Sequence, residues 1–168
     1  MTLEERIEKI KDLRPIDDVF FEAIAEDKEV CQEMLQTIME DNSLTVSDVI
    51  VQRSERNLFG RSVRLDALCT LGNGTLCNIE VQRSNNDDHL RRARYNASRE
   101  TDVGTRFESI PEVYVIYISE FDFFKKGKTI YHIEKIIKET GNYVDDGFHE
   151  IFVNTSVYDG TKISDLMR

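Results

Sequence analysis

Two acidic residues and a glutamine are the residues of this sequence whose types and spacing point most directly to chemistry. Asp66 lies in the segment RLDALC, and Glu80 and Gln82 lie in the later segment NIEVQR. A pair of neighbouring carboxylates supplies the oxygen ligands that Mg²⁺ and Mn²⁺ prefer in proteins. The amide of a glutamine beside them could orient a water molecule or hold a phosphate oxygen. These residue types predict a metal site if the fold brings the two carboxylates together.

A β-hairpin is the element that would bring the two carboxylates together. Residues 62–71 and 75–83 both alternate apolar and polar side chains, which predicts two strands that each have one buried face. A two-residue turn would place Asp66 opposite an apolar residue of the second strand, which mixes the faces and buries a carboxylate. A three-residue loop, Gly72-Asn73-Gly74, keeps the faces consistent and is equally standard in hairpins. Consistency of the faces therefore selects the three-residue loop.

The three-residue loop fixes the cross-strand partners. On the buried face it pairs Leu65 with Val81, Ala67 with Ile79 and Cys69 with Cys77, and on the other face it pairs Asp66 with Glu80 and Arg64 with Gln82. Directly opposed residues have Cβ atoms about 4.5–5.5 Å apart, where like charges destabilise a hairpin. A divalent cation between two carboxylates reverses the sign of that interaction. The hairpin alone leaves two interpretations open: a metal site, or two tolerated surface acids that Arg64 shields.

The remaining elements are predicted from hydrophobic periodicity and strand composition. We expect helices over residues 3–13, from Asp17 or Asp18 to about Ile24, over about 28–41 and within 86–103, and strands over 45–52, 112–119, 129–133 and 148–154. The segment EVYVIYIS is almost entirely apolar or aromatic, which is typical of a strand buried on both faces. This order predicts a single α/β or α+β domain, with N-terminal helices in residues 1–42 and a core over about 45–155.

The distribution of charge qualifies the formal net charge of −10. An acidic surface repels a phosphate backbone, which disfavours nucleic acid as a partner. Residues 51–110, however, carry eight acidic and ten basic residues, and all ten bases are arginine. Arginine binds phosphate through two parallel hydrogen bonds. The arginine-rich middle is compatible with a phosphate-binding surface and equally with a solvated surface of mixed charge.

Other features exclude whole classes of protein. No apolar run approaches the roughly 20 residues that a transmembrane helix needs. Cys31, Cys69 and Cys77 are too few and wrongly spaced for a disulfide scaffold or a zinc site, so we expect a cytoplasmic protein with reduced thiols. The three histidines, His89, His132 and His149, lack metal-ligand spacing and are interpreted as structural. Phe121, Phe123 and Phe124 are expected to form a hydrophobic anchor after the strand over 112–119.

At the Asp-x13-Glu-x-Gln pattern, the sequence resembles the PD-(D/E)xK nuclease superfamily and, within it, the Rpn group of recombination-promoting nucleases and transposase-like proteins. The motifs that carry the resemblance are Arg64-Leu65-Asp66, Gly72-Asn73-Gly74, Asn78-Ile79-Glu80-Val81-Gln82 and Arg92-Ala93-Arg94-Tyr95, together with Asp17-Asp18-Val19-Phe20 and the segments VYVIYISEFDFF, KTIYHIE and EIFVNT. The resemblance covers roughly residues 15–155. It implies a restriction-endonuclease-like αβββαβ core, with a mixed central sheet flanked by helices. Similar proteins continue with further C-terminal helices, which we expect this chain to lack.

The resemblance also implies roles for particular residues. Asp66 and Glu80 correspond to the metal ligands, assisted by the backbone carbonyl of Val81, with Mg²⁺ or Mn²⁺ as the cofactor. Gln82 is the third catalytic residue and stands where the wider superfamily has lysine. Arg64, Arg92, Arg94 and Tyr95 are the expected contacts to DNA phosphates. Asp18, Glu22 and Glu26 are candidates for a further acid of the metal site, and each is also a plausible surface or capping residue.

The activity implied by the resemblance is metal-dependent hydrolysis of DNA phosphodiester bonds, linked to recombination or transposition. The partner is then DNA, with no membrane, and a homodimer is a further expected state. Two alternatives remain open at this point: a catalytically inactive domain of the same fold that binds DNA or protein, and a structural domain without any metal.

Overall fold

The computed structural model of the chain describes residues 16–51, 54–55, 63–64, 66–83, 89–97 and 106–166. Its elements follow one another in the order α2 (Asp18–Ala25), α3 (Lys28–Ile38), β1 (Val46–Val51), β2 (Ser54–Glu55), β3 (Val63–Arg64), β4 (Ala67–Leu71), β5 (Leu76–Gln82), α4 (His89–Ala97), a 3-10 helix (Phe107–Ser109), β6 (Val113–Ser119), β7 (Ile130–Ile133), β8 (Lys135–Ile136), β9 (Tyr143–Val144), β10 (Phe148–Asn154) and α5 (Lys162–Leu166). The helix expected over residues 3–13 lies outside the described residues.

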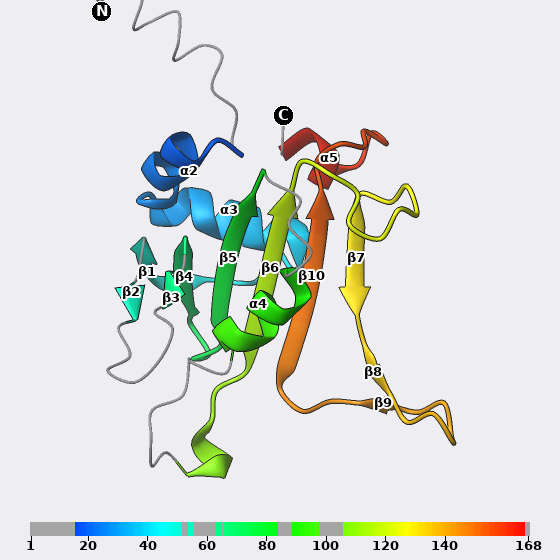
Figure 1. The fold of residues 1–168 in the computed structure, drawn as a ribbon. Helices are drawn as coiled ribbons and strands as arrows, with labels where there is room; N and C mark the ends of the chain where they lie inside the picture. The colour runs from blue at the N-terminus through cyan, green and yellow to red at the C-terminus, as the bar shows by residue number, and fades with distance from the viewer. Residues whose placement is uncertain are drawn as a thin grey trace, which may run out of the picture.

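A six-stranded mixed sheet forms the centre of the molecule (Figure 1). The strand order is β1-β4-β5-β6-β10-β7. Strands β1, β4 and β5 are antiparallel neighbours, β5, β6 and β10 run parallel, and β7 returns antiparallel to β10. Two-stranded ribbons, β2–β3 and β8–β9, extend from this sheet. The predicted mixed α/β sheet is confirmed.

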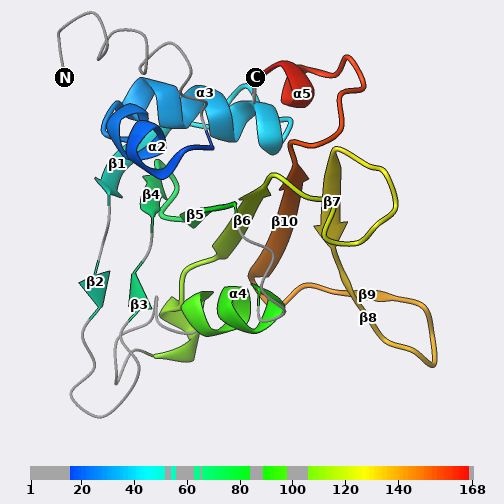
Figure 2. The same cartoon turned by 45° about the horizontal axis from the view of Figure 1, so that its top comes forward.

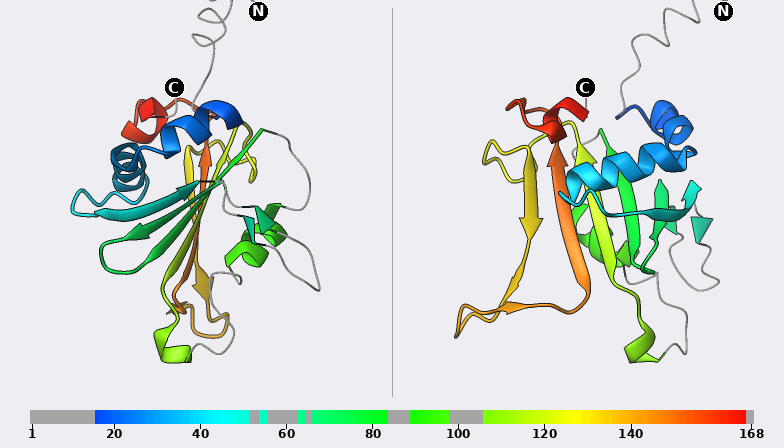
Figure 3. Two further views of the ribbon diagram at one scale, coloured as in Figure 1. Left: turned by 90° about the vertical axis from the view of Figure 1, so that its left-hand side faces the viewer. Right: turned by 180° about the vertical axis from the view of Figure 1, so that it is seen from behind.

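Helices cover both faces of the sheet, so that three layers result. Helices α2 and α3 lie on one face and α4 lies on the other, as the edge-on view in Figure 3 shows. Figure 2 shows the same separation, with α2 and α3 at one side of the strands and α4 at the other. The large core lies under α3, where the buried Met34, Leu35 and Ile38 belong to one cluster with Ile79 and Ile116 of the sheet.

Strand β5 separates apolar from polar side chains by simple alternation. Cys77, Ile79 and Val81 belong to the core cluster that includes α3. Asn78, Glu80 and Gln82 alternate with them and point to the α4 face, because successive side chains of a strand point to opposite sides. On that face the buried Ala93 of α4 packs against the sheet. Helix α4 therefore packs on this face, chiefly over β6, and Asn78 and Glu80 of the polar row are buried there.

The hairpin between β4 and β5 has the predicted register. Ala67 pairs with Ile79 and Cys69 pairs with Cys77. The three-residue loop that this register requires ends at Gly74, whose φ of +90° is favoured by glycine because it lacks a Cβ atom. The three cysteines are free thiols, as expected.

The strand predicted over residues 62–71 is wrong as one continuous element. Its first part, β3, pairs with β2, and Arg64 lies opposite Ser54 instead of Gln82. Asp66 then lies in a bend, and the described ladder between β4 and β5 ends at Ala67 and Ile79. The physical reason is a side-chain hydrogen bond at Asp66, described below. The ribbon β2–β3 lies on the same side of the sheet as α4 (Figures 2 and 3).

The aromatic residues after β6 pack as expected. Phe123 stacks on Phe152 of β10 at 5.4 Å between ring centroids, and Phe124 meets the same ring edge-on at 5.1 Å. The 3-10 helix, the ribbon β8–β9 and α5 were not anticipated. Among the described residues, no helix is long and apolar enough to cross a membrane.

The hairpin loop gives a stability prediction. Substitution Gly74→Ala forces a Cβ atom into the left-handed region, although no neighbouring atom lies within 4 Å of it, so the cost is backbone strain alone. We expect the free energy of unfolding, measured by urea denaturation, to fall by about 1 kcal/mol or more. Gly74→Asn is the matched control, because asparagine tolerates this conformation better, and its loss should be smaller. Equal stability of both variants and the wild type would contradict the loop conformation.

Candidate active site

The first feature of the candidate site is the anchoring of Asp66 to β5. The backbone N–H of Val81 donates to Oδ2 of Asp66 at 2.8 Å. In a regular antiparallel ladder such an N–H donates to a carbonyl oxygen of the neighbouring strand. Here a carboxylate serves as the acceptor, and the chain bends at Asp66. The carboxylate of Asp66 is thereby held within one residue of Glu80, on the side of Val81 that faces β4.

The backbone carbonyl of Val81 lies on the same side as its N–H. In a strand, the N–H and C=O groups of one residue point to the same neighbouring strand, because hydrogen-bonded pairs exchange both bonds. The N–H of Leu71 donates to the carbonyl of Thr75, so by alternation the pair Ala67–Ile79 is also of the hydrogen-bonded kind, and Val81 follows Ile79 by two residues. The Asp66 carboxylate and the Val81 carbonyl thus lie on the β4 side of Val81, and Asp66 gets there through a bend and not as a strand residue directly opposed to Glu80. That both join Glu80 in holding one ion stays a prediction.

Glu80 is buried in a polar layer between the sheet and α4. Only 3% of Glu80 is exposed, and its Oε1 accepts a 2.9 Å hydrogen bond from Nδ2 of Asn78, which is 1% exposed. The Oδ1 atom of Asn78 has no hydrogen-bond partner among the described residues. Buried polar atoms are almost always satisfied, so an unsatisfied carbonyl oxygen indicates a site for water or an ion.

Gln82 belongs to a network that joins three elements. Its Oε1 accepts from Nη1 of Arg92 in α4 at 3.2 Å and from the hydroxyl of Tyr117 in β6 at 3.5 Å. Tyr117 is 1% exposed and lies opposite Glu80 in the parallel pair of β5 and β6. The role of Tyr117 was not predicted, because the register of two parallel strands separated by a helix leaves no local signal in the sequence.

An ion-pair network that the sequence did not indicate closes the end of β5. Arg83 Nη1 lies 2.7 Å from Asp17 Oδ1, and its Nε lies 3.2 Å from Glu120 Oε2. Asp17 occupies the N-cap position of α2, but its side chain makes no capping hydrogen bond. The network therefore ties the start of α2 and the end of β6 to the residue after Gln82.

The early acids differ in their positions. Glu22 is half-buried in α2, and Glu26 is exposed at the C-cap of that helix. The side chain of Asp18 lies outside the description. Asp17 contacts Arg83 at the end of β5, and the part of Asp18, Glu22 or Glu26 in a metal site stays a prediction.

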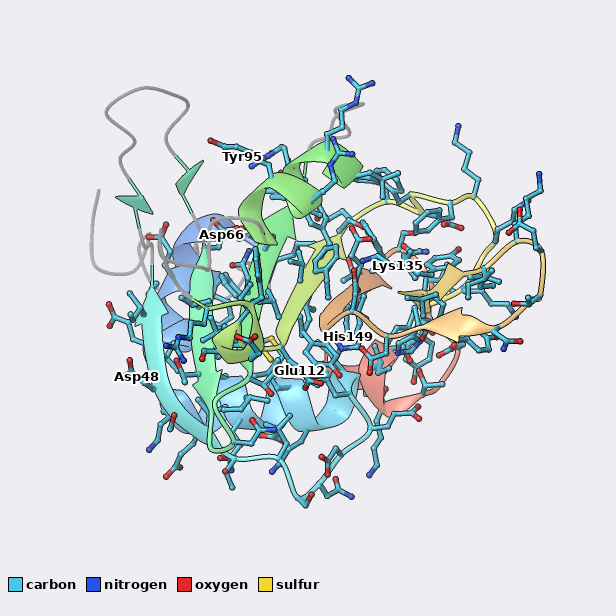
Figure 4. All side chains as sticks on the ribbon, turned by 90° about the horizontal axis from the view of Figure 1, so that it is seen from below. Asp48, Asp66, Tyr95, Glu112, Lys135 and His149 are labelled. Atoms are coloured by element: carbon cyan, nitrogen blue, oxygen red, sulfur yellow. The ribbon has the colours of Figure 1, made fainter. Side chains whose placement is uncertain are left out.

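The expected phosphate contacts lie on two elements at the α4 side of the sheet. Arg94 is exposed on α4, and Tyr95 of the same helix is 37% exposed. Figure 4, a view along the strands, shows Tyr95 and Asp66 on this side. The backbone of Arg64 lies in β3, and its side chain is not described. Arg92 differs from Arg94 because it is half-buried and bonded to Gln82.

Among the described side chains, the cysteines and histidines form no competing metal site. Burial raises the pKa of the Cys77 thiol to about 12, and a side-chain hydrogen bond with Cys31 together with burial raises the pKa of Cys69, so both thiols remain protonated at neutral pH. His149 stacks on Tyr114 with 4.3 Å between ring centroids, which agrees with a structural role. In the described part of the chain, no group of three or more His, Cys, Asp or Glu side chains could hold a metal ion.

A divalent cation fits the donors at the end of β5. The set consists of two carboxylates and a backbone carbonyl, which are the hard oxygen ligands of Mg²⁺ and Mn²⁺. Mg²⁺ usually keeps several water ligands and uses one or two carboxylates, so a site with two acids is sufficient. The unsatisfied Oδ1 of Asn78 beside Glu80 fits a hydrated ion in this layer.

Comparison with known proteins identifies the family. The family model described as PD-(D/E)XK nuclease family transposase matches residues 17–164. The chain therefore belongs to this family, and the membership supports a nuclease-related function. PD-(D/E)XK nucleases generally use divalent metal ions and act on DNA. No curated protein and no solved structure matches the chain significantly.

The hydrogen bond at Asp66 gives a prediction that needs no metal. Asp66→Ala leaves the partly buried N–H of Val81 without its acceptor, so we expect the free energy of unfolding in EDTA to fall by about 1.5–3 kcal/mol. Asp66→Asn retains an acceptor oxygen and should lose clearly less. Urea denaturation of both variants measures the difference. Wild-type stability of Asp66→Ala would show that this contact does not hold the bend.

Proposed function

We propose that the chain is a metal-dependent DNA endonuclease that hydrolyses phosphodiester bonds in recombination or transposition. The observation that carries the proposal is the hydrogen bond from Val81 N–H to Asp66, which holds one carboxylate beside the buried Glu80. Membership of the PD-(D/E)XK nuclease family transposases supports the same chemistry.

In this proposal Asp66, Glu80 and the carbonyl of Val81 hold Mg²⁺ or Mn²⁺. When bound, the cation would polarise the phosphoryl oxygen as a Lewis acid and lower the pKa of the attacking water toward neutrality. Asn78 holds the carboxylate of Glu80 in position through its 2.9 Å hydrogen bond. Val81 N–H does the same for Asp66. Gln82 presents its amide to the attacking water or to a phosphate oxygen.

DNA would approach from the α4 side of the sheet. The proposal assigns phosphate contacts to Arg94 and Tyr95 of α4 and to Arg64 of β3, because arginine forms two parallel hydrogen bonds with phosphate. Arg92 belongs to the same surface but is also bonded to Gln82. Helices α2 and α3, which lie across the sheet from α4, would face away from the DNA. A homodimer stays a prediction.

Cleavage of a supercoiled plasmid tests this proposal. With Mg²⁺ or Mn²⁺ the wild type should convert supercoiled plasmid to nicked and linear forms, and EDTA should abolish the reaction. Glu80→Gln and Asp66→Asn remove one ligand charge each and should lower the rate at least 10²-fold, because each acts on the ion that stabilises the developing charge.

Asp48→Asn is the matched control for the cleavage assay. Asp48 is exposed on the edge strand β1, where it pairs with Thr70 of β4 and lies apart from Asp66 (Figure 4), so its loss should leave the rate unchanged. Equal cleavage by the wild type and Glu80→Gln would indicate a contaminating nuclease. DNA binding without cleavage by the wild type would favour the alternative of a catalytically inactive nuclease fold.

A further inference from the structure

The contact between Arg92 and Gln82 carries an inference beyond the metal site. Arg92 is half-buried in α4 and donates from Nη1 to Oε1 of Gln82 at 3.2 Å, and the hydroxyl of Tyr117 approaches the same oxygen at 3.5 Å. An arginine at neutral pH can donate hydrogen bonds but cannot accept them. The oxygen of the Gln82 amide must therefore face Arg92. The flipped amide would place its NH₂ group against the guanidinium, and two donors cannot form a hydrogen bond.

This orientation determines what Gln82 offers to the site. Because Oε1 is held by Arg92 and Tyr117, the NH₂ group points away from both of them, and Gln82 acts as a hydrogen-bond donor. A lysine at this position would likewise present N–H donors, but with a positive charge. The guanidinium of Arg92 also polarises the amide through the shared oxygen, which strengthens the N–H groups as donors.

Arg92 carries the positive charge that a lysine at position 82 would have, and it contacts Gln82. Arg92 places a permanent cation 3.2 Å from the amide oxygen of Gln82, in a partly buried position where charges are screened less than at the surface. The neighbouring Arg91 and Arg94 are exposed. Arg92 is the half-buried arginine of the described part of α4, and it is the one whose guanidinium reaches Gln82.

We propose that Arg92 is a positioning residue that fixes Gln82 as a hydrogen-bond donor and supplies the cation that glutamine lacks, so that Gln82 and Arg92 act as one unit. This inference rests on the proposed nuclease function. It also has a consequence that is independent of cleavage: a lysine at position 82 is incompatible with Arg92, because two cations would then meet at hydrogen-bond distance.

A double-mutant cycle in EDTA tests the contact without metal or DNA. The four proteins are the wild type, Gln82→Lys, Arg92→Met and the variant with both substitutions. Each single substitution should lower Tm by at least about 2–4 °C, which corresponds to one lost hydrogen bond in a chain of this size. The double variant should be more stable than Gln82→Lys alone, because removal of Arg92 relieves the repulsion. Arg91→Met is the matched control, and its effect should be the same with glutamine or lysine at position 82.

Cleavage kinetics distinguish positioning from simple phosphate binding. Arg92→Met should lower kcat about 10–100-fold with little change in KM, as is typical for residues that orient a metal-site group. In the Gln82→Lys background the same substitution should raise kcat. Arg92→Lys, which keeps the charge and one donor, should retain more activity than Arg92→Met.

Three results would overturn either the inference or the function on which it rests. If the effects of Gln82→Lys and Arg92→Met on Tm were additive while the wild type cleaved DNA, the two residues would not act together. The proposed nuclease function would be unaffected. If Arg92→Met raised KM equally with glutamine and with lysine at position 82, Arg92 would only bind phosphate. A wild type that fails to cleave DNA but shows the coupling in Tm would contradict the proposed function and leave the contact itself in place.

Discussion

The geometry of the candidate site depends on which group accepts the hydrogen bond from the backbone N–H of Val81. A carbonyl oxygen of the neighbouring strand would have continued the ladder, whereas here the carboxylate of Asp66 accepts the bond at 2.8 Å. The chain bends at this point, β3 pairs with β2, and the carboxylate stays anchored to β5 next to Glu80. A single side-chain hydrogen bond thus accompanies the end of the regular ladder and anchors Asp66 to the residue that follows Glu80.

The two faces of the sheet differ in the polarity of their buried side chains. Beneath α3 the side chains are apolar and form one large core, which supplies most of the stability. Beneath α4, Asn78, Glu80 and Tyr117 are buried polar residues. Burial of polar groups and charges is costly unless each one is paired, so a chain selected for stability alone would place apolar residues there. The retention of this polar layer is understandable if it holds a ligand, and α4 keeps bulk solvent away from it.

The sequence was sufficient for the features that depend on local alternation. The register of β4 and β5 follows from the requirement that apolar side chains share one face, and Phe148–Asn154 forms a strand with the predicted bounds. The break at Asp66 could not be predicted, because alternation does not show when a side chain replaces a backbone acceptor. Contacts between distant segments were also missed: Tyr117 reaches Gln82 through a parallel pairing, and Arg83 joins Asp17 to Glu120 through tertiary packing.

Anomalous diffraction from crystals soaked in Mn²⁺ tests the central claim most directly, since it locates the ion independently of any activity. The account predicts an anomalous peak between the carboxylates of Asp66 and Glu80 and the carbonyl oxygen of Val81, at about the 2.0–2.2 Å expected for hard oxygen ligands. A peak elsewhere on the surface, or the two carboxylates too far apart to share one ion, would contradict it.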